Sequence, residues 1–95
     1  MRMIDPGRLR LPPSRMSGAD PMKLADQYKR FGKSIAGMPP IEVTEGANAE
    51  LMINDGVTRA TRIYRYADEG TLVPVTIIET RPQTDLTGLP LVSER

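Results

Sequence analysis

Apolar residues recur at helical spacing in two stretches of the chain. The first apolar stripe consists of Leu24, Tyr28, Phe31 and Ile35. Residues at this spacing fall on one face of a helix, so we expect Tyr28 to pack in the core. Asp20 is a good N-cap, Pro21 suits the first helical position, and Gly37 ends the pattern.

The second stretch predicts a helix over residues 57–67. The residues expected on its core face are Val57, Ala60, Ile63, Tyr64 and Ala67. Arg59, Arg62 and Tyr66 are expected on a different face of this helix. On this interpretation Tyr66 is the tyrosine that could be exposed and stack on a base.

Apolar–polar alternation and β-branched runs predict four short strands. They cover residues 8–11, 41–44, 50–53 and 72–79. Pro74 restricts the last of these to a sheet edge, a strand start or an irregularity. The element order is β-α-β-β-α-β, which predicts the α+β class, with a small mixed sheet of about four strands and two packed helices.

The end of the chain differs from the rest in its pattern. Residues 81–95 are polar and rich in turn-forming residues, and we expect a tail that Leu89, Leu91 and Val92 order in part. The length of 95 residues suits one domain with a modest core. We therefore expect a domain over residues 3–80 followed by a tail, with any site at the surface or beside a partner.

Two residue types are missing, and this limits the chemistry. The chain has no Cys, which excludes a disulfide, a thiol nucleophile and a thiolate metal site. It also has no His, the commonest general base and metal ligand. A bound metal would therefore be a hard cation held by carboxylates, Mg²⁺ or Mn²⁺ rather than zinc, and we expect no haem or flavin.

The net charge of +1 argues against bulk electrostatic attraction to DNA. Any contact with a nucleic acid has to come from local clusters of basic residues. Lys29, Arg30 and Lys33 form one such cluster on the first predicted helix, and it could follow a polynucleotide backbone. The ordinary alternative is a solvated helix face.

Residues 53–62 read as a strand end, a glycine turn and the first turn of a helix. Unpaired N–H groups and the helix dipole favour an anion at such a helix start, and Arg59 and Arg62 add planar charged groups that match phosphate oxygens. Gly56 would let the backbone approach a ligand closely. The alternative is that Asp55 only caps the helix, Gly56 relaxes the turn and the arginines are solvated.

Four segments together resemble the ParB N-terminal / sulfiredoxin superfamily. They are LRLPPSR at 9–15, MPPIEV at 38–43, LMINDGVTRA at 51–60 and VPV at 73–75. Each is weak alone, but their order and spacing on the predicted elements strengthen the match, which covers roughly residues 3–80. The resemblance implies phosphate binding at the strand–helix corner, with Gly56, Thr58 and Arg59 at the binding positions and Arg62 near a second phosphate.

Members of this superfamily include CTP-hydrolysing DNA-loading proteins, ATP-dependent sulfiredoxins, serine kinases, nucleases and toxin tips of secreted bacterial proteins. Val57 occupies the position of the sulfiredoxin cysteine, so we expect no sulfiredoxin activity. The chain ends where the DNA-binding domain of the CTP-dependent proteins would begin, which makes a clamp loading at a specific DNA site a poor expectation.

The resemblance and the residue types together give candidate catalytic residues. Arg59 would clamp a phosphate, Asp55 could hold Mg²⁺ or orient a water, and Glu42 could project towards the same corner. Each has an ordinary alternative, since Asp55 is often an N-cap and Glu42 a cross-strand ion-pair partner. Thr58 could equally make a hydrogen bond at the helix start.

Three hypotheses follow. The first is a metal-assisted nuclease acting on DNA, as the toxin module of a secreted effector that has a cognate immunity protein. The second is a non-catalytic ATP- or CTP-binding regulatory module, and the third is a degenerate interaction domain in which Arg59 and Arg62 pair with carboxylates. The sequence has no membrane-length apolar run and no signal-peptide core, so we expect a cytoplasmic protein, or a secreted module that acts in a target-cell cytoplasm.

Overall fold

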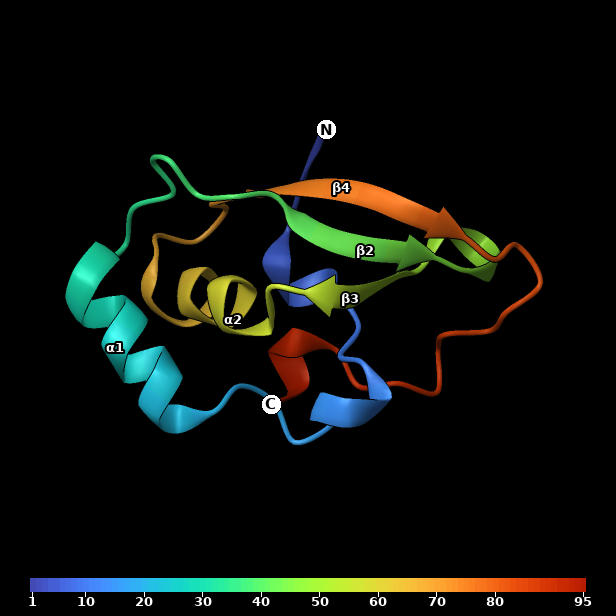
Figure 1. Ribbon diagram of the computed structural model, residues 1–95, viewed down its shortest axis with the longest axis horizontal. Coiled ribbons are helices and arrows are strands. Elements are labelled where there is room, and N and C mark those ends of the chain that lie inside the picture. The colour runs from blue at the N-terminus through green and yellow to red at the C-terminus, as the bar shows by residue number, and fades with distance from the viewer.

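The protein is a mixed four-stranded sheet with two α-helices on one side of it, as the computed structural model of residues 1–95 shows (Figure 1). The elements in chain order are β1 (Arg2–Ile4), α1 (Pro21–Phe31), β2 (Ile41–Glu45), β3 (Leu51–Asp55), α2 (Val57–Tyr66) and β4 (Val73–Thr80). The predicted α+β class and element order are confirmed. Neither helix has both the length and the apolar character needed to cross a membrane.

The strand order in the sheet is β1-β4-β2-β3. The β2–β3 pair is an antiparallel hairpin, whereas β4 runs parallel to β2 and antiparallel to β1. Pro74 pairs with Met3 of β1 and lies just before the first residue of β4 that pairs with β2. Its position near the strand start is one of the places where the lack of an N–H group is tolerated.

The prediction of a strand over residues 8–11 is wrong in its bounds, because the first strand lies at Arg2–Ile4. A 3₁₀ turn over Pro6–Arg8 interrupts the extended chain, so β1 cannot continue into the residues predicted as a strand. Arg10 nevertheless exchanges backbone hydrogen bonds with β3, donating to the Leu51 carbonyl at 2.8 Å and accepting from the Ile53 N–H at 2.9 Å. This segment therefore covers the outer edge of β3.

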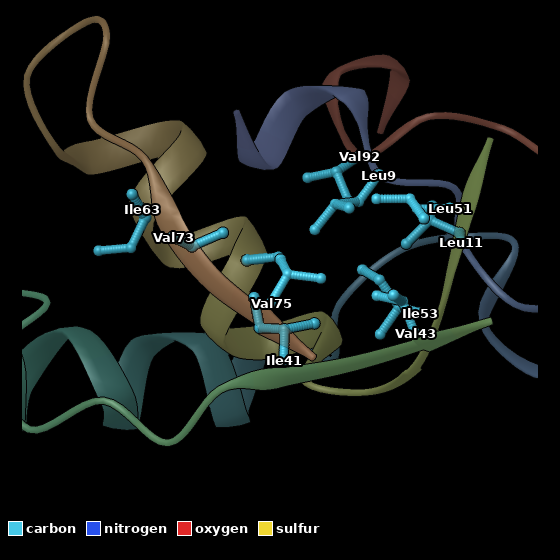
Figure 2. Close-up of a cluster of buried hydrophobic side chains, with 11 residues drawn as sticks. Leu9, Leu11, Ile41, Val43, Leu51, Ile53, Ile63, Val73, Val75 and Val92 are labelled. Atoms are coloured by element: carbon cyan, nitrogen blue, oxygen red, sulfur yellow. The ribbon is translucent and has the colours of Figure 1, made fainter. Parts of the chain in front are cut away.

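The core lies between the inner face of the sheet on one side and, on the other, α2 together with the segments that carry Leu9, Leu11 and Val92 (Figure 2). Its residues are Leu9, Leu11, Ile41, Val43, Leu51, Ile53, Ala60, Ile63, Val73, Val75 and Val92. Alternate residues of β2, β3 and β4 point inwards, as the period of two requires. Most of these side chains are aliphatic and β-branched, which suits close packing on a pleated surface.

The last segment of the chain is more than a tail. Val92 belongs to the core, and its N–H donates to the Leu9 carbonyl at 2.9 Å. The Leu11 N–H donates to the Pro90 carbonyl at 2.8 Å, and Leu86 is buried against Gly46. The ordering expected from three apolar residues thus extends through much of residues 81–95.

Helix α1 packs mainly against α2 and lies on the side of α2 away from the strands (Figure 1). Leu24 is its only buried residue, while Tyr28 is 41% exposed. The prediction that Tyr28 packs in the core is wrong, because the helix faces another helix rather than the sheet. The Tyr28 ring instead lies against Tyr66, with ring centroids 4.5 Å apart.

Helix α2 buries a different set of side chains from the one expected. Ala60 and Ile63 are buried as predicted, but Tyr64 is 43% exposed and Arg62 is only 2% exposed. Helix α1 covers the Arg62 face, and this gives the arginine an interior environment that helical periodicity does not indicate. Because the Tyr64 side chain is nearly half exposed, its assignment to the core is wrong.

The turn between β2 and β3 contains two residues with left-handed backbone. Asn48 has φ 60° and Ala49 has φ 61°. Asparagine tolerates this region, whereas the Cβ of alanine is crowded there by roughly 1–2 kcal/mol. Two successive left-handed residues match the right-handed twist of the hairpin, so the turn suits the strands even though it strains Ala49.

We predict that Ala49→Gly raises the free energy of unfolding by about 0.5–1 kcal/mol, because relief of the left-handed strain exceeds the added entropy of the unfolded chain. Urea unfolding followed by circular dichroism measures the change. Ala47→Gly, at a neighbouring residue outside the left-handed region, is the matched control and is expected to give no gain. Equal gains in both variants would contradict the strain argument.

Candidate functional site

A hollow of about 330 Å³ lies where β3 ends and α2 begins. Its walls come from this corner, from Lys23 and Gln27 of α1 and from the loop before α1. The lining residues are Pro12, Ser14, Arg15, Ala19, Asp20, Lys23, Gln27, Asn54, Asp55, Gly56, Val57, Thr58 and Arg59. Four of the predicted site residues, Asp55, Gly56, Thr58 and Arg59, therefore line one hollow.

Gly56 is the N-cap of α2 and has φ 119°, a backbone conformation that favours glycine. A Cβ here would lie 3.0 Å from both Arg59 Nη2 and Ile41 Cγ1, so the space beside Gly56 belongs to the packed Arg59 side chain. No side chain caps α2, and its first turn has no acidic residue. The alternative role of Asp55 as the helix cap is therefore wrong, and the first N–H groups of α2 have no side-chain acceptor.

The Arg59 side chain is 18% exposed and only weakly held by protein groups. Its Nη2 donates to the Pro40 carbonyl at 3.3 Å and lies 3.5 Å from the Asp55 carboxylate, which is itself 69% exposed. The Nε atom is buried and has no hydrogen-bond partner. An unpaired buried donor costs about 1–3 kcal/mol, so the protein alone leaves Arg59 incompletely satisfied.

Two further cations face the hollow from the opposite wall. Arg15 comes from the loop before α1 and Lys23 from the first turns of α1, and neither forms an ion pair. Asp20, between them, caps α1 by accepting the N–H groups of Met22 and Lys23 at 2.8 and 3.3 Å. These hydrogen bonds lower the pKa of the Asp20 carboxyl, and the charges of Lys23 and Arg15 lower it further.

Arg62 does not line this hollow. Its Nη1 donates to the carbonyls of Gly32 and Ser34 at 2.8 and 2.9 Å, and its Nε donates to Gln27 Oε1 at 3.3 Å. Burial lowers the pKa of its guanidinium. The Arg62 guanidinium thus binds interior oxygen atoms and does not line the hollow, where we expected it to lie near a second phosphate.

The remaining candidates lie outside the hollow. Glu42 is exposed and is the cross-strand partner of Asp55, but it does not line the hollow. Lys29, Arg30 and Lys33 are exposed residues at the far half of α1 and beyond it, and Arg30 pairs with Asp26 at 3.6 Å. The structure therefore places Glu42 next to the strand–helix corner, but none of these four residues lines the hollow.

The acidic groups of the hollow are Asp20 and Asp55. No group of three or more acidic side chains lies close enough together to hold a metal ion. Mg²⁺ commonly takes one or two carboxylates and completes its shell with water and substrate phosphate. These two residues would suit Mg²⁺ only in that manner, together with a bound phosphate.

Sequence reasoning missed the second wall of the hollow, formed by Ser14, Arg15, Asp20, Lys23 and Gln27. Arg15 lies in the LRLPPSR segment that carries part of the family resemblance, and this was the one available signal. The N-cap role predicted for Asp20 is confirmed, but nothing local indicates that this cap faces the turn at Gly56.

Comparisons with known proteins add nothing to this geometry, since the chain matches no family model, no curated protein and no solved structure. The candidate site therefore rests on the arrangement of its own residues.

We predict that Asp20→Asn removes a pH-dependent part of the stability. The folded-state pKa of Asp20 is lower than its ordinary value of 3.8, so its contribution is complete above that value and is lost as the pH falls through the folded pKa. The difference in Tm between wild type and Asp20→Asn should be constant above about pH 5 and change below about pH 4. The pKa of Asp85 is also lowered, but Asp85 is present in both proteins, so its contribution cancels in the Tm difference. A constant difference at every pH would contradict this prediction.

Proposed function

We propose that this protein binds the phosphate of a nucleotide or a nucleic acid in the hollow at the β3–α2 corner. The observation that carries the proposal is Arg59, whose buried Nε has no partner and which lies in the first turn of an uncapped helix. A phosphate oxygen can accept a hydrogen bond from Arg59 where its side chain lines the hollow, and the free N–H groups of α2 can receive other oxygens.

The charge around the hollow supports an anionic ligand. Three cations, Arg15, Lys23 and Arg59, line it together with two carboxylates. Arg62, one turn along α2, adds a buried positive charge that is held by carbonyl and amide oxygens and has no carboxylate partner. Positive charge that is partly desolvated and not balanced by the protein favours a bound anion.

The size and chemistry of the hollow also fit phosphate. Its lining residues are mostly polar or charged, with few apolar side chains for a base or a sugar to contact. A volume of about 330 Å³ is at the lower end of small-molecule sites, which suits a di- or triphosphate group whose nucleoside extends outwards. The G-x-x-R sequence at residues 56–59, and its resemblance to ParB- and sulfiredoxin-like domains, agrees with this ligand.

A second candidate function is metal-assisted phosphodiester cleavage, with DNA as the first substrate to test. The specific observation in its favour is that Asp20 and Asp55 line the same hollow as Arg59. Mg²⁺, when bound with a phosphate, would supply charge stabilisation for cleavage. In this role Arg59 orients the phosphate, Asp55 orients a water, and Glu42 takes no part. A toxin activity with an immunity partner belongs to this second candidate.

We predict that Arg59→Gln weakens binding of pyrophosphate by about tenfold or more without lowering the stability of the protein, because it removes a charged ligand group and also the unpaired Nε. Isothermal titration calorimetry with sodium pyrophosphate, ATP and CTP measures the affinities, and urea unfolding measures the stability. Arg81→Gln is the matched control, since Arg81 is an exposed arginine paired with Glu79 at 3.1 Å and lies outside the hollow.

The same titrations can overturn the proposal. Equal affinities for pyrophosphate in wild type and Arg59→Gln, or no binding by folded wild type, would exclude the corner as a phosphate site. Supercoiled plasmid and single-stranded RNA, incubated with Mg²⁺ or with EDTA, test the second candidate. Cleavage that needs both the metal and Arg59 would establish it, and pyrophosphate binding without cleavage would leave the binding function alone.

A further inference from the structure

Helix α1 forms one wall of the hollow, yet little apolar packing holds it in place. No residue of α1 belongs to the main core cluster, and Leu24 is its only buried side chain. Figure 1 shows α1 at the end of the molecule, separated from the strands by α2. Most helices in proteins are stabilised by burying a broad apolar face, so the docking of α1 needs another explanation.

The strongest polar contact between the two helices is made by Arg62 of α2. It donates to the carbonyls of Gly32 and Ser34, just past the end of α1, and to the side chain of Gln27 within α1. Its guanidinium carbon also lies 5.4 Å from the centroid of the Phe31 ring. One arginine thus holds the C-terminal part of α1, where the helix dipole is negative.

Two residues, Gln27 and Arg59, connect the Arg62 contact with the hollow. Gln27 accepts a hydrogen bond from Arg62 and also lines the hollow beside Lys23. Arg59 lies one turn before Arg62 on α2 and forms the opposite wall. A phosphate between Lys23 and Arg59 would therefore join the same two helices that Arg62 joins.

We infer that Arg62 is a positioning residue, which docks α1 against α2 as a wall of the anion site, and that an anion in the hollow tightens this docking. The second half of the inference rests on the proposed function. Without Arg62, the carbonyls of Gly32 and Ser34 lose their donor. The apolar contacts that remain are those of Leu24, of Tyr28 with Tyr66, and of Ile35 and Met38 after the helix.

Hydrogen exchange of the α1 backbone amides, followed by NMR with and without sodium pyrophosphate, tests the inference. In wild type, α1 should exchange by local opening faster than β2 and β4, and saturating pyrophosphate should slow α1 about tenfold while changing the strands less. Arg62→Met, which keeps the length and the apolar stem, should speed α1 exchange about tenfold and weaken pyrophosphate binding. Arg62→Lys should restore only part of both, because it lacks the planar fork.

Arg65→Met is the matched control, since the exposed Arg65 on the same helix donates to the carbonyl of Arg95 and not to α1. Unchanged α1 exchange in Arg62→Met would overturn the positioning role. If Arg62→Met fails to fold, the exchange rates of the wild type decide the question. In that case, α1 amides that exchange at the same rate as those of β2 and β4 would overturn the positioning role. Pyrophosphate that binds without slowing α1 would overturn the coupling alone, whereas no pyrophosphate binding would refute the proposed function and leave the ligand-free test of Arg62 standing.

Discussion

The turn at Gly56 is the constraint on which the candidate site depends. Its left-handed φ of 119° turns the chain from β3 into α2 within one residue, and the missing Cβ makes room for Ile41 and the Arg59 side chain. Because α2 then starts directly at the sheet edge, its uncapped N–H groups open into the hollow rather than into a loop. The close approach of Ile41 of β2 and the position of the Arg59 side chain thus both depend on a glycine here.

Arg59 and Arg62 of α2 show how the same residue type can serve two purposes three residues apart. Arg62 has acceptors for its Nε and Nη1 inside the protein, and these acceptors join two elements distant in sequence. Arg59 has one carbonyl partner at 3.3 Å, a solvent-exposed carboxylate at 3.5 Å and an orphaned Nε. Arg15, Lys23 and Arg59 line the hollow and Arg62 lies one turn further along α2, so four cations lie near this corner of a protein whose net charge is only +1.

The local sequence pattern predicted the helices and strands well, but it predicted poorly which elements pack against one another. The strands around Ile41–Glu45 and Val73–Thr80 carry β-branched alternation, and the cap at Asp20 has a local mechanism, so each could be predicted from the chain. The burial of Arg62 could not be predicted, because helical periodicity assigns arginine to the polar face and does not reveal the carbonyl acceptors just past the end of α1. The few apolar residues of 81–95 follow neither a helical nor a strand period, so the sequence did not predict how closely they pack. About half of the residues that line the hollow, 54–59, are contiguous in the sequence. The others come from α1 and the segment before it, and their place depends on how α1 docks.

The difference between Arg59 and Arg62 bears on whether the hollow is for a ligand. A purely structural arginine in a half-buried place is expected to have its donors satisfied, because each orphaned donor lowers stability by about 1–3 kcal/mol. Arg62 meets this expectation for its buried Nε, and Arg59 does not. A group kept unsatisfied beside unpaired Arg15 and Lys23 resembles the strained or unsatisfied groups that proteins retain at binding sites. The hypothesis of a degenerate interaction domain expects both arginines to pair with carboxylates. Arg59 lies 3.5 Å from the Asp55 carboxylate, as that hypothesis expects, but Arg62 has no carboxylate partner and Arg59 Nε has none at all.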